Sequence, residues 1–277
     1  MLGLILSQAH VHAAELNDIA SIQKSGVIRV GVIKNDLPGF KWKVVKDEIV
    51  TNPDGTSKTI QTEVFQGPEI DLINNIASKM GVTTSFNDEF KNQEELIAMI
   101  AKGKIDVAVS KIQQTYPRWA NVRFSRPYIK IPYAAIYNRL DIEASVDKTK
   151  KLSDEFLKFK GKIGVIKGTA YEPAAKEHFK NSEVVTFDNW KSAVAALKSD
   201  KVSLLYRAEF EIKALLKADP QLNIKYGVAS VKDRTSNISV AICDSCGKLQ
   251  QFINYYLDTE INNFSIVNSL QLLDAKK

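Results

Sequence analysis

One pattern occurs twice in this chain and limits what it can fold into. Residues 96–101 carry apolar side chains at helical spacing, Gly103 ends that helix, and residues 105–109 form an apolar run of strand length. Residues 193–206 repeat the same order of helix, polar turn and strand. Residues 27–32 and 161–169 each combine a strand with glycine. The chain is therefore predicted to form two α/β lobes of similar plan.

Length and composition agree with an exported two-domain protein. The 277 residues suffice for two domains of about 100–150 residues, and 44% hydrophobic with 25% charged residues is ordinary globular composition. No apolar run approaches the roughly 20 residues of a membrane span. Residues 1–14 favour a signal-peptide remnant with a cleavage site near Ala13; a disordered tail is the alternative. We therefore expect an exported protein.

Several function classes are excluded. The net charge of +6 does not indicate nucleic-acid binding, because Lys is interleaved with Glu and Asp and no basic stripe with aromatic platforms occurs. Two of the three histidines, His10 and His12, lie in the N-terminal segment, which leaves little for a catalytic triad or a multi-His metal site. No phosphate-binding or dinucleotide glycine motif is present. We expect no metal and no cofactor.

The strongest functional pattern lies at residues 105–118. An apolar strand ends in polar residues, a turn follows, and Arg118 stands where a helix should begin. Strand ends and helix starts commonly hold small anions, and a guanidinium can grip a carboxylate at two points. A strand, a loop and a solvated arginine are the alternative. The spacing alone does not separate the two.

Cys243 and Cys246 form a C-x-x-C motif. A zinc site normally needs four ligands, and no second pair exists. A disulfide is the default in an exported protein, while a redox pair stays open because the motif lies between a strand and a helix.

Ordered motifs then identify a family. They are residues 26–32, 67–72, 103–106, Thr115 with Arg118, the Phe124-Ser125-x-Pro127-Tyr128 run, and residues 160–165 and 168–169. From about residue 22 to the C-terminus the chain resembles the family 3 solute-binding proteins, the periplasmic amino-acid receptors of ABC importers. The resemblance implies a type II periplasmic binding protein fold: two α/β lobes, each a mostly parallel sheet flanked by helices, joined by two crossing strands.

The resemblance also implies how the chain is divided. Lobe one would contain residues 22–135 plus 243–277, lobe two would contain residues 138–238, and the ligand would bind in the cleft between them. Residues 44–65 predict a long hairpin around an Asn-Pro-Asp-Gly turn, either decoration or a lip on the cleft. Residues 141–154 predict a surface loop.

The resemblance assigns site residues one by one. Arg118 falls on the carboxylate-binding arginine. The other ligand-binding candidates are Ser110, Lys111, Gln113, Asp36 and Phe40 for lobe one and Thr169, Ala170, Tyr171 and Glu209 for lobe two. Ala208 stands where an aspartate commonly pairs with the ligand ammonium, and Glu209 is one step on. Packing in a loop is the alternative for Gln113 and Tyr171.

Charge at these positions favours an anionic ligand. Lys111, Arg118, Lys167 and Arg207 outnumber Asp36 and Glu209. We therefore expect an acidic amino acid or a related organic acid, although a neutral or basic amino acid stays possible.

Three function classes remain. The first is a monomeric receptor that closes on its ligand and delivers it to an ABC permease of the inner membrane. The second is an enzyme similar to cyclohexadienyl dehydratases, which would need Glu209 or Glu172 as a general acid with its pKa raised by burial. The third is a sensor or adhesion protein on the same fold. The receptor is favoured, with no enzymatic activity.

Overall fold

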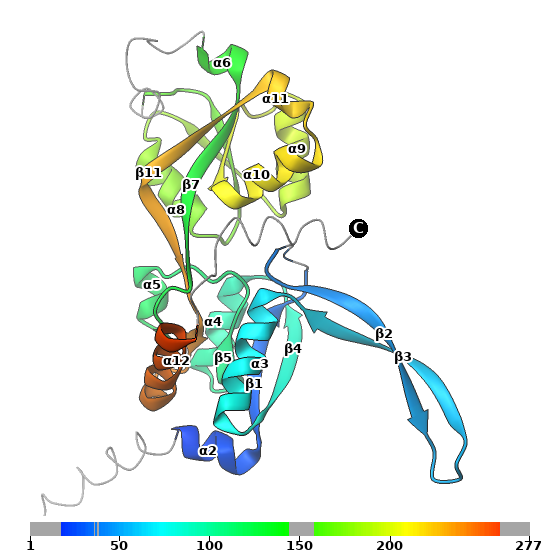
Figure 1. The fold of residues 1–277 in the computed structure, drawn as a ribbon. Coiled ribbons are helices and arrows are strands. Elements are labelled where there is room, and N and C mark those ends of the chain that lie inside the picture. Colours follow the sequence, from blue (N-terminus) through cyan, green and yellow to red (C-terminus); the bar gives the residue numbers. More distant parts are fainter. Residues whose placement is uncertain (1–17, 36, 38, 144–157, 261–277) are drawn as a thin grey trace, which may run out of the picture. The chain divides into compact units, whose positions relative to one another are not determined.

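The chain forms two compact units in a computed structural model, which describes residues 18–35, 37, 39–143 and 158–260 (Figure 1). Unit 1 consists of Met1–Ile112, Tyr116–Tyr128 and Ser239–Lys277, and unit 2 of Gln113–Thr115 and Ile129–Ile238. Residues 1–14 and most of the predicted surface loop lie outside the described residues. Among the described helices, none is long and apolar enough to cross a membrane.

Unit 1 is built on a five-stranded sheet with the order β4-β1-β5-β12-β6. Strands β4 (Thr83–Phe90), β1 (Val27–Ile33) and β5 (Val107–Ala108) are parallel, whereas β12 (Ala241–Ile242) runs antiparallel to β5 and to β6 (Arg123–Phe124). In β1, residues 28, 30 and 32 lie on one face and are fully buried, and Gly31 on the opposite face is buried too, although Arg29 on that face stays exposed.

Five helices of the described chain belong to unit 1: α2 (Asp18–Ser25), α3 (Pro68–Met80), α4 (Gln93–Ala101), α5 (Tyr116–Trp119) and α12 (Gly247–Thr259). Helix α12 packs against α2, and the Asp18 carboxylate accepts the Leu249 N–H at 2.9 Å. The N-terminal and C-terminal helices of the described chain are thus tied together.

Helix α3 has clear start and stop signals. Pro68 occupies its first turn, where a missing N–H costs nothing. Gly67 precedes it with φ 121°, and a Cβ there would lie 2.5 Å from the carbonyl oxygen of Phe40. Gly81 ends the helix in the left-handed region at φ 73°. At position 67, only glycine therefore lets the segment carrying Phe40 pass so close to the start of α3.

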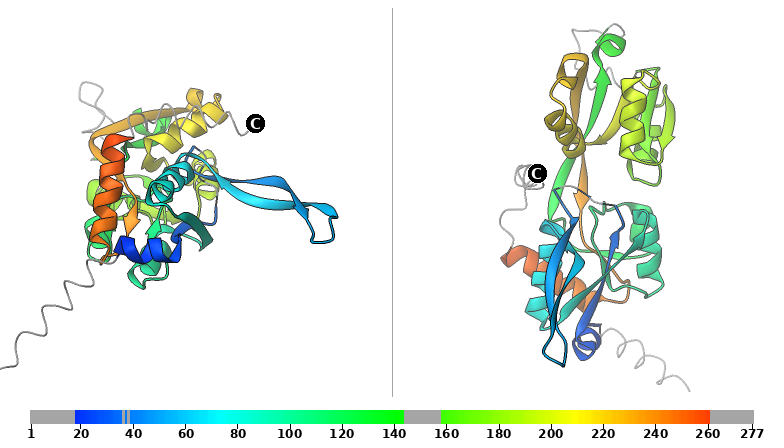
Figure 2. Two further views of the ribbon diagram at one scale, coloured as in Figure 1. Left: turned by 60° about the horizontal axis from the view of Figure 1, so that its bottom comes forward. Right: turned by 90° about the vertical axis from the view of Figure 1, so that its right-hand side faces the viewer.

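The predicted hairpin is confirmed as the ribbon β2 (Trp42–Thr51) and β3 (Ser57–Gln66), paired antiparallel from Trp42↔Gln66 to Thr51↔Ser57. It projects from the rest of unit 1 in Figure 1 and in the left-hand view of Figure 2. Its outer part buries little, since Ile49 is 75% exposed.

Unit 2 contains the second five-stranded sheet, in the order β11-β7-β10-β8-β9. Strands β10 (Leu204–Ala208), β8 (Lys162–Ile166) and β9 (Glu183–Phe187) are parallel, and β7 (Ile129–Asn138) runs antiparallel to β10 and to β11 (Tyr226–Ile238). Its described helices are α6 (Arg139–Glu143), α8 (Tyr171–His178), α9 (Trp190–Lys198), α10 (Glu209–Ala218) and α11 (Leu222–Lys225).

The repeated sequence pattern corresponds to a repeated structure. Helix α4 precedes β5 in unit 1, and α9 precedes β10 in unit 2. Asn92 caps α4 by accepting the Glu95 N–H, and Asn189 caps α9 by accepting the Ser192 N–H. The prediction of two α/β units of similar plan is confirmed.

Candidate functional site

The turn after β5 is held by hydrogen bonds to two other elements of unit 1, β1 and α4. The Ser110 hydroxyl oxygen accepts the Ile33 N–H at 2.9 Å. The side-chain amide of Gln93 donates to the carbonyl oxygens of Ser110 at 2.9 Å and Lys111 at 2.8 Å. Ser110 and Lys111, both predicted ligand contacts, are therefore fixed before any ligand arrives.

Lys111 adopts an unusual backbone conformation, with φ 53°. Its N–H donates to the Glu69 Oε1 atom at 2.6 Å, and the Tyr128 hydroxyl donates to the same oxygen. The Lys111 ammonium lies 5.6 Å from the centre of the Phe40 ring. Two predicted site residues, Lys111 and Phe40, are thus brought together in unit 1.

Glu69 is a buried acid that sequence reasoning missed. Its side chain has no exposure, and burial raises its pKa, although the bonds from Tyr128 and the Lys111 N–H and the charges of Lys41 and Lys111 act in the opposite direction. Burial also raises the pKa of Tyr128 well above its usual value. Within the described residues, the Glu69 Oε2 atom has no hydrogen-bond partner.

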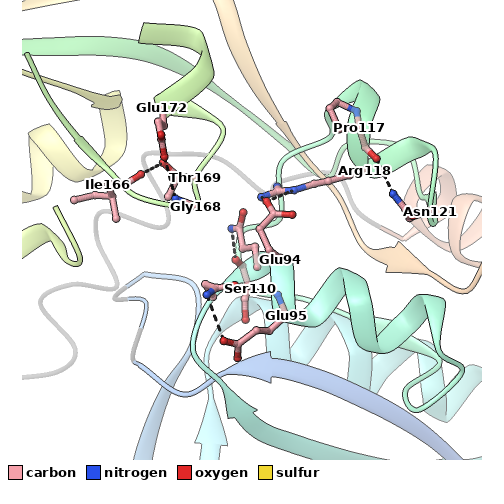
Figure 3. Close-up of polar contacts among 12 residues, drawn as sticks. Glu94, Glu95, Ser110, Pro117, Arg118, Asn121, Ile166, Gly168, Thr169 and Glu172 are labelled. Atoms are coloured by element: carbon pink, nitrogen blue, oxygen red, sulfur yellow. Dashed lines mark hydrogen bonds and ion pairs between the residues drawn. The ribbon is translucent and has the colours of Figure 1, made fainter. Parts of the chain in front are cut away.

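Arg118 lies in α5 and its side chain is 3% exposed. Its Nε and Nη2 atoms donate to one oxygen of Glu94, Oε1, at 3.2 and 2.7 Å (Figure 3). Glu94 belongs to the first turn of α4 and is 55% exposed. The predicted carboxylate-binding arginine is therefore buried beside an acid that the sequence-based charge count omitted.

The corresponding loop of unit 2 follows β8. Gly168 has φ 68°, its N–H donates to Glu172 at 3.3 Å, and the Thr169 hydroxyl donates to the Ile166 carbonyl oxygen at 2.7 Å (Figure 3). Ala170 is half-buried directly before α8 and offers no side-chain cap. Glycine at the left-handed position permits this tight turn.

Gln113 and Tyr171 join a buried polar network in unit 2. The Gln113 amide nitrogen donates to the Tyr133 hydroxyl, and its Oε1 accepts from Ser236 at 3.1 Å. The hydroxyls of Tyr171 and Ser236 lie 2.8 Å apart. Tyr171 is 6% exposed, and its pKa is raised well above the usual value, chiefly by burial. Both side chains therefore contribute to packing within the unit.

Arg207, near the end of β10, is held by a carboxylate and two aromatic rings of unit 2. Arg207 pairs with Glu211 at 3.2 Å and lies over the rings of Tyr171 and Trp190, 5.8 and 5.4 Å from their centres. Within the described chain, the Arg207 Nε and Nη1 atoms are buried without hydrogen-bond partners. Because Glu211 lies beside Arg207, this arginine does not add the unopposed positive charge assumed from the sequence.

The two residues that follow Arg207 differ in polarity and in their contacts. Ala208 is fully buried. Glu209 accepts from the Ser230 hydroxyl at 2.7 Å and pairs with Lys213 at 3.2 Å. Glu209 thus has partners of its own inside unit 2.

The predicted site residues divide between the units. Unit 1 holds Phe40, Ser110, Lys111 and Arg118; unit 2 holds Gln113, Thr169, Ala170, Tyr171 and Glu209. Asp36 lies outside the described residues. Gln93, Glu94, Glu69 and Glu211 were not predicted, because each acts through a tertiary contact that no local pattern reveals.

Cys243 and Cys246 form a disulfide, as predicted, between β12 and α12. The Cys243 N–H donates to the Asp106 carbonyl oxygen at 3.1 Å, which anchors the short loop to the end of the turn before β5. No cluster of metal-ligating side chains occurs among the residues that the structure describes.

The chain resembles known proteins in both sequence and fold. A family model described as "Bacterial extracellular solute-binding proteins, family 3" matches residues 50–202, more than half of the chain. A probable histidine-binding protein of Campylobacter jejuni subsp. jejuni is 30% identical over 164 residues, which cover 58% of this chain and 59% of that protein. The alignment thus spans less than two thirds of this relative.

Solved structures show the fold. An amino acid ABC transporter substrate-binding protein of Streptococcus pneumoniae bound to L-arginine has a TM-score of 0.65 at 20% identity, covering 92% of this chain and 98% of that one. The ancestral amino acid-binding protein AncCDT-1, a precursor of cyclohexadienyl dehydratase, has a TM-score of 0.64 at 22% identity, covering 93% and 97%. The predicted two-lobe type II periplasmic binding protein fold is confirmed.

Proposed function

Since the chain belongs to family 3 of the bacterial extracellular solute-binding proteins, we propose that it is a receptor that closes on an amino acid and delivers it to an ABC importer. The observation that carries the proposal is the Arg118 guanidinium, 3% exposed yet charged, placed by a short helix after the turn that follows β5. A planar guanidinium held in one orientation suits two-point recognition of a carboxylate.

The proposed ligand is a basic amino acid, with arginine and histidine first. The relative from C. jejuni is named as a probable histidine-binding protein, and the S. pneumoniae structure holds L-arginine. Neither relative supports the acidic ligand expected from the sequence. The charge count behind that expectation omitted two acids. Glu94 pairs with Arg118 and Glu211 with Arg207, so these two arginines are already neutralised.

We also propose that the receptor is a monomer and that it is located in the periplasm, or outside the cell and anchored at its surface. Lobe one is proposed to span residues 22–135 with 243–277, and lobe two residues 138–238. The site is proposed to draw on Arg118, Lys111 and Ser110 from unit 1 and on the Gly168–Tyr171 loop from unit 2.

An enzymatic role is disfavoured by Glu172. A dehydratase-like reaction would need a general acid whose pKa is raised. The pKa of Glu172 is instead lowered, first by the hydrogen bond from Lys176 and also by the Gly168 N–H. This carboxylate is therefore suited to remain ionised and to accept the loop N–H.

Calorimetry on protein unfolded and refolded to remove any retained ligand tests the proposal. The panel is L-arginine, L-histidine, L-lysine, L-glutamine, L-glutamate, L-aspartate and succinate. A cationic amino acid should bind most tightly, and at about 100 times its dissociation constant it should stabilise the fold by ~2.7 kcal/mol. Tightest binding of glutamate, aspartate or succinate would contradict the ligand class, and no binding by any amino acid would contradict the function.

A further inference from the structure

The α-ammonium group of an amino-acid ligand needs a carboxylate partner, and the expected position lacks one. Ala208 occupies that position, is fully buried and offers no polar side-chain atom. Its neighbour Glu209 is bonded to Ser230 and Lys213. An ammonium withdrawn from water without an acceptor is costly, so another acid should meet it.

We propose that Glu94 is the residue that binds the ligand α-ammonium, beside Arg118, which binds the ligand carboxylate. This inference rests on the proposed function and deepens it, because it defines how the amino-acid headgroup is recognised. Both residues belong to unit 1, so the headgroup site is complete within one unit.

The geometry of the pair carries the proposal. Both hydrogen bonds from Arg118 go to the Oε1 atom of Glu94, and within the described residues no donor reaches its Oε2 atom. The Glu94 side chain is 55% exposed, whereas that of Arg118 is 3% exposed. The Glu94 side chain is thus partly exposed to solvent next to a guanidinium that is buried.

Charge arrangement explains which ligands such a pair selects. In an α-amino acid the ammonium and the carboxylate branch from the same carbon, so the headgroup is itself a short ion pair. Laid antiparallel against Arg118 and Glu94, each of its charges meets the opposite charge, and the ammonium can donate up to three hydrogen bonds. An acid without the ammonium would bring its carboxylate close to that of Glu94, and no positive charge of the ligand would offset the repulsion between the two carboxylates.

Glu95 provides a matched control in the same helical turn. Its carboxylate turns back to accept the Lys91 N–H at 2.8 Å, whereas that of Glu94 points to Arg118 (Figure 3). Glu94→Gln and Glu95→Gln therefore remove the same charge from the same turn of α4, and only the first removes it from Arg118.

The test uses the full chain and two pairs of probes that differ in the ammonium alone. They are L-arginine with 5-guanidinopentanoate, and L-histidine with 3-(imidazol-4-yl)propionate. Glu94→Gln should weaken the amino acids at least about tenfold, while the ammonium-free acids bind as well as before or more tightly. Glu95→Gln should change neither by more than about twofold.

Three results would overturn the inference. Equal weakening of both members of a pair would make Glu94 a residue that only orients Arg118. Tighter binding of the amino acids by Glu94→Gln would make Glu94 an internal competitor for Arg118. If the parent binds no amino acid of the panel, the proposed function fails, and the inference fails with it. Thermal unfolding of both variants confirms that each is folded.

Discussion

The Glu69 carboxylate accepts the backbone N–H of Lys111 at 2.6 Å, so a fully buried acid holds the turn that follows β5. The bond spans from the first turn of α3 to a residue at φ 53°. It explains how lysine can hold a left-handed conformation that most residues avoid: the cost of the backbone is offset by a buried hydrogen bond.

This acid predicts a specific dependence of stability on pH. Burial raises the pKa of Glu69 above its ordinary value of 4.5. The folded chain therefore binds this proton more tightly than the unfolded chain does. The resulting stability is fully present below pH 4.5 and is lost as pH rises through the folded-state pKa. In urea unfolding, the parent should lose stability relative to Glu69→Gln as pH rises from 4.5. A parent that gains stability relative to the variant over that range would contradict the assignment.

The Gln113 network predicts a cost in stability. Gln113→Ala would leave the hydroxyls of Tyr133 and Ser236 each with one buried partner fewer. The free energy of unfolding should fall by about 1–3 kcal/mol, as expected when buried polar groups lose their partners. Chemical denaturation measures it. An unchanged free energy would mean that the side chain serves the ligand and not the packing of unit 2.

The disulfide predicts a small effect. Cys243 and Cys246 are three residues apart, and closing so short a loop restricts the unfolded chain only slightly. Replacing both by alanine should lower the free energy of unfolding by about 2 kcal/mol or less and leave ligand affinity unchanged. Thiol titration of the unfolded parent, purified without reductant, should detect no free thiol. Two free thiols, or a loss well above that figure, would contradict this purely structural role.

Local patterns were sufficient for the architecture. The helix–turn–strand order at residues 96–109 and 193–206 predicted α4 with β5 and α9 with β10, because helix periodicity, caps and strand runs are properties of short segments. The hairpin β2–β3 was equally visible, since an Asn-Pro-Asp-Gly turn separates two alternating runs.

Partners of individual side chains were not predictable in this way. Glu94 precedes Arg118 by 24 residues, and only the packing of α4 decides that it points to the arginine while Glu95 does not. Glu69 is the opposite of what its residue type suggests, because a glutamate near a helix start is normally exposed. The acidic ligand inferred from the sequence has no support from the relatives, and the charges behind it were counted before their partners were known.

Calorimetric titration of Arg118→Lys tests most directly whether Arg118 receives the carboxylate of an amino-acid ligand. The variant keeps the positive charge and loses the planar fork. Against the amino acid that the parent binds most tightly, affinity should fall at least about tenfold, or roughly 1.4 kcal/mol. Its decarboxylated amine should bind equally weakly to both proteins. Equal affinity of parent and variant for the amino acid would contradict the assignment of Arg118 as the carboxylate-binding residue.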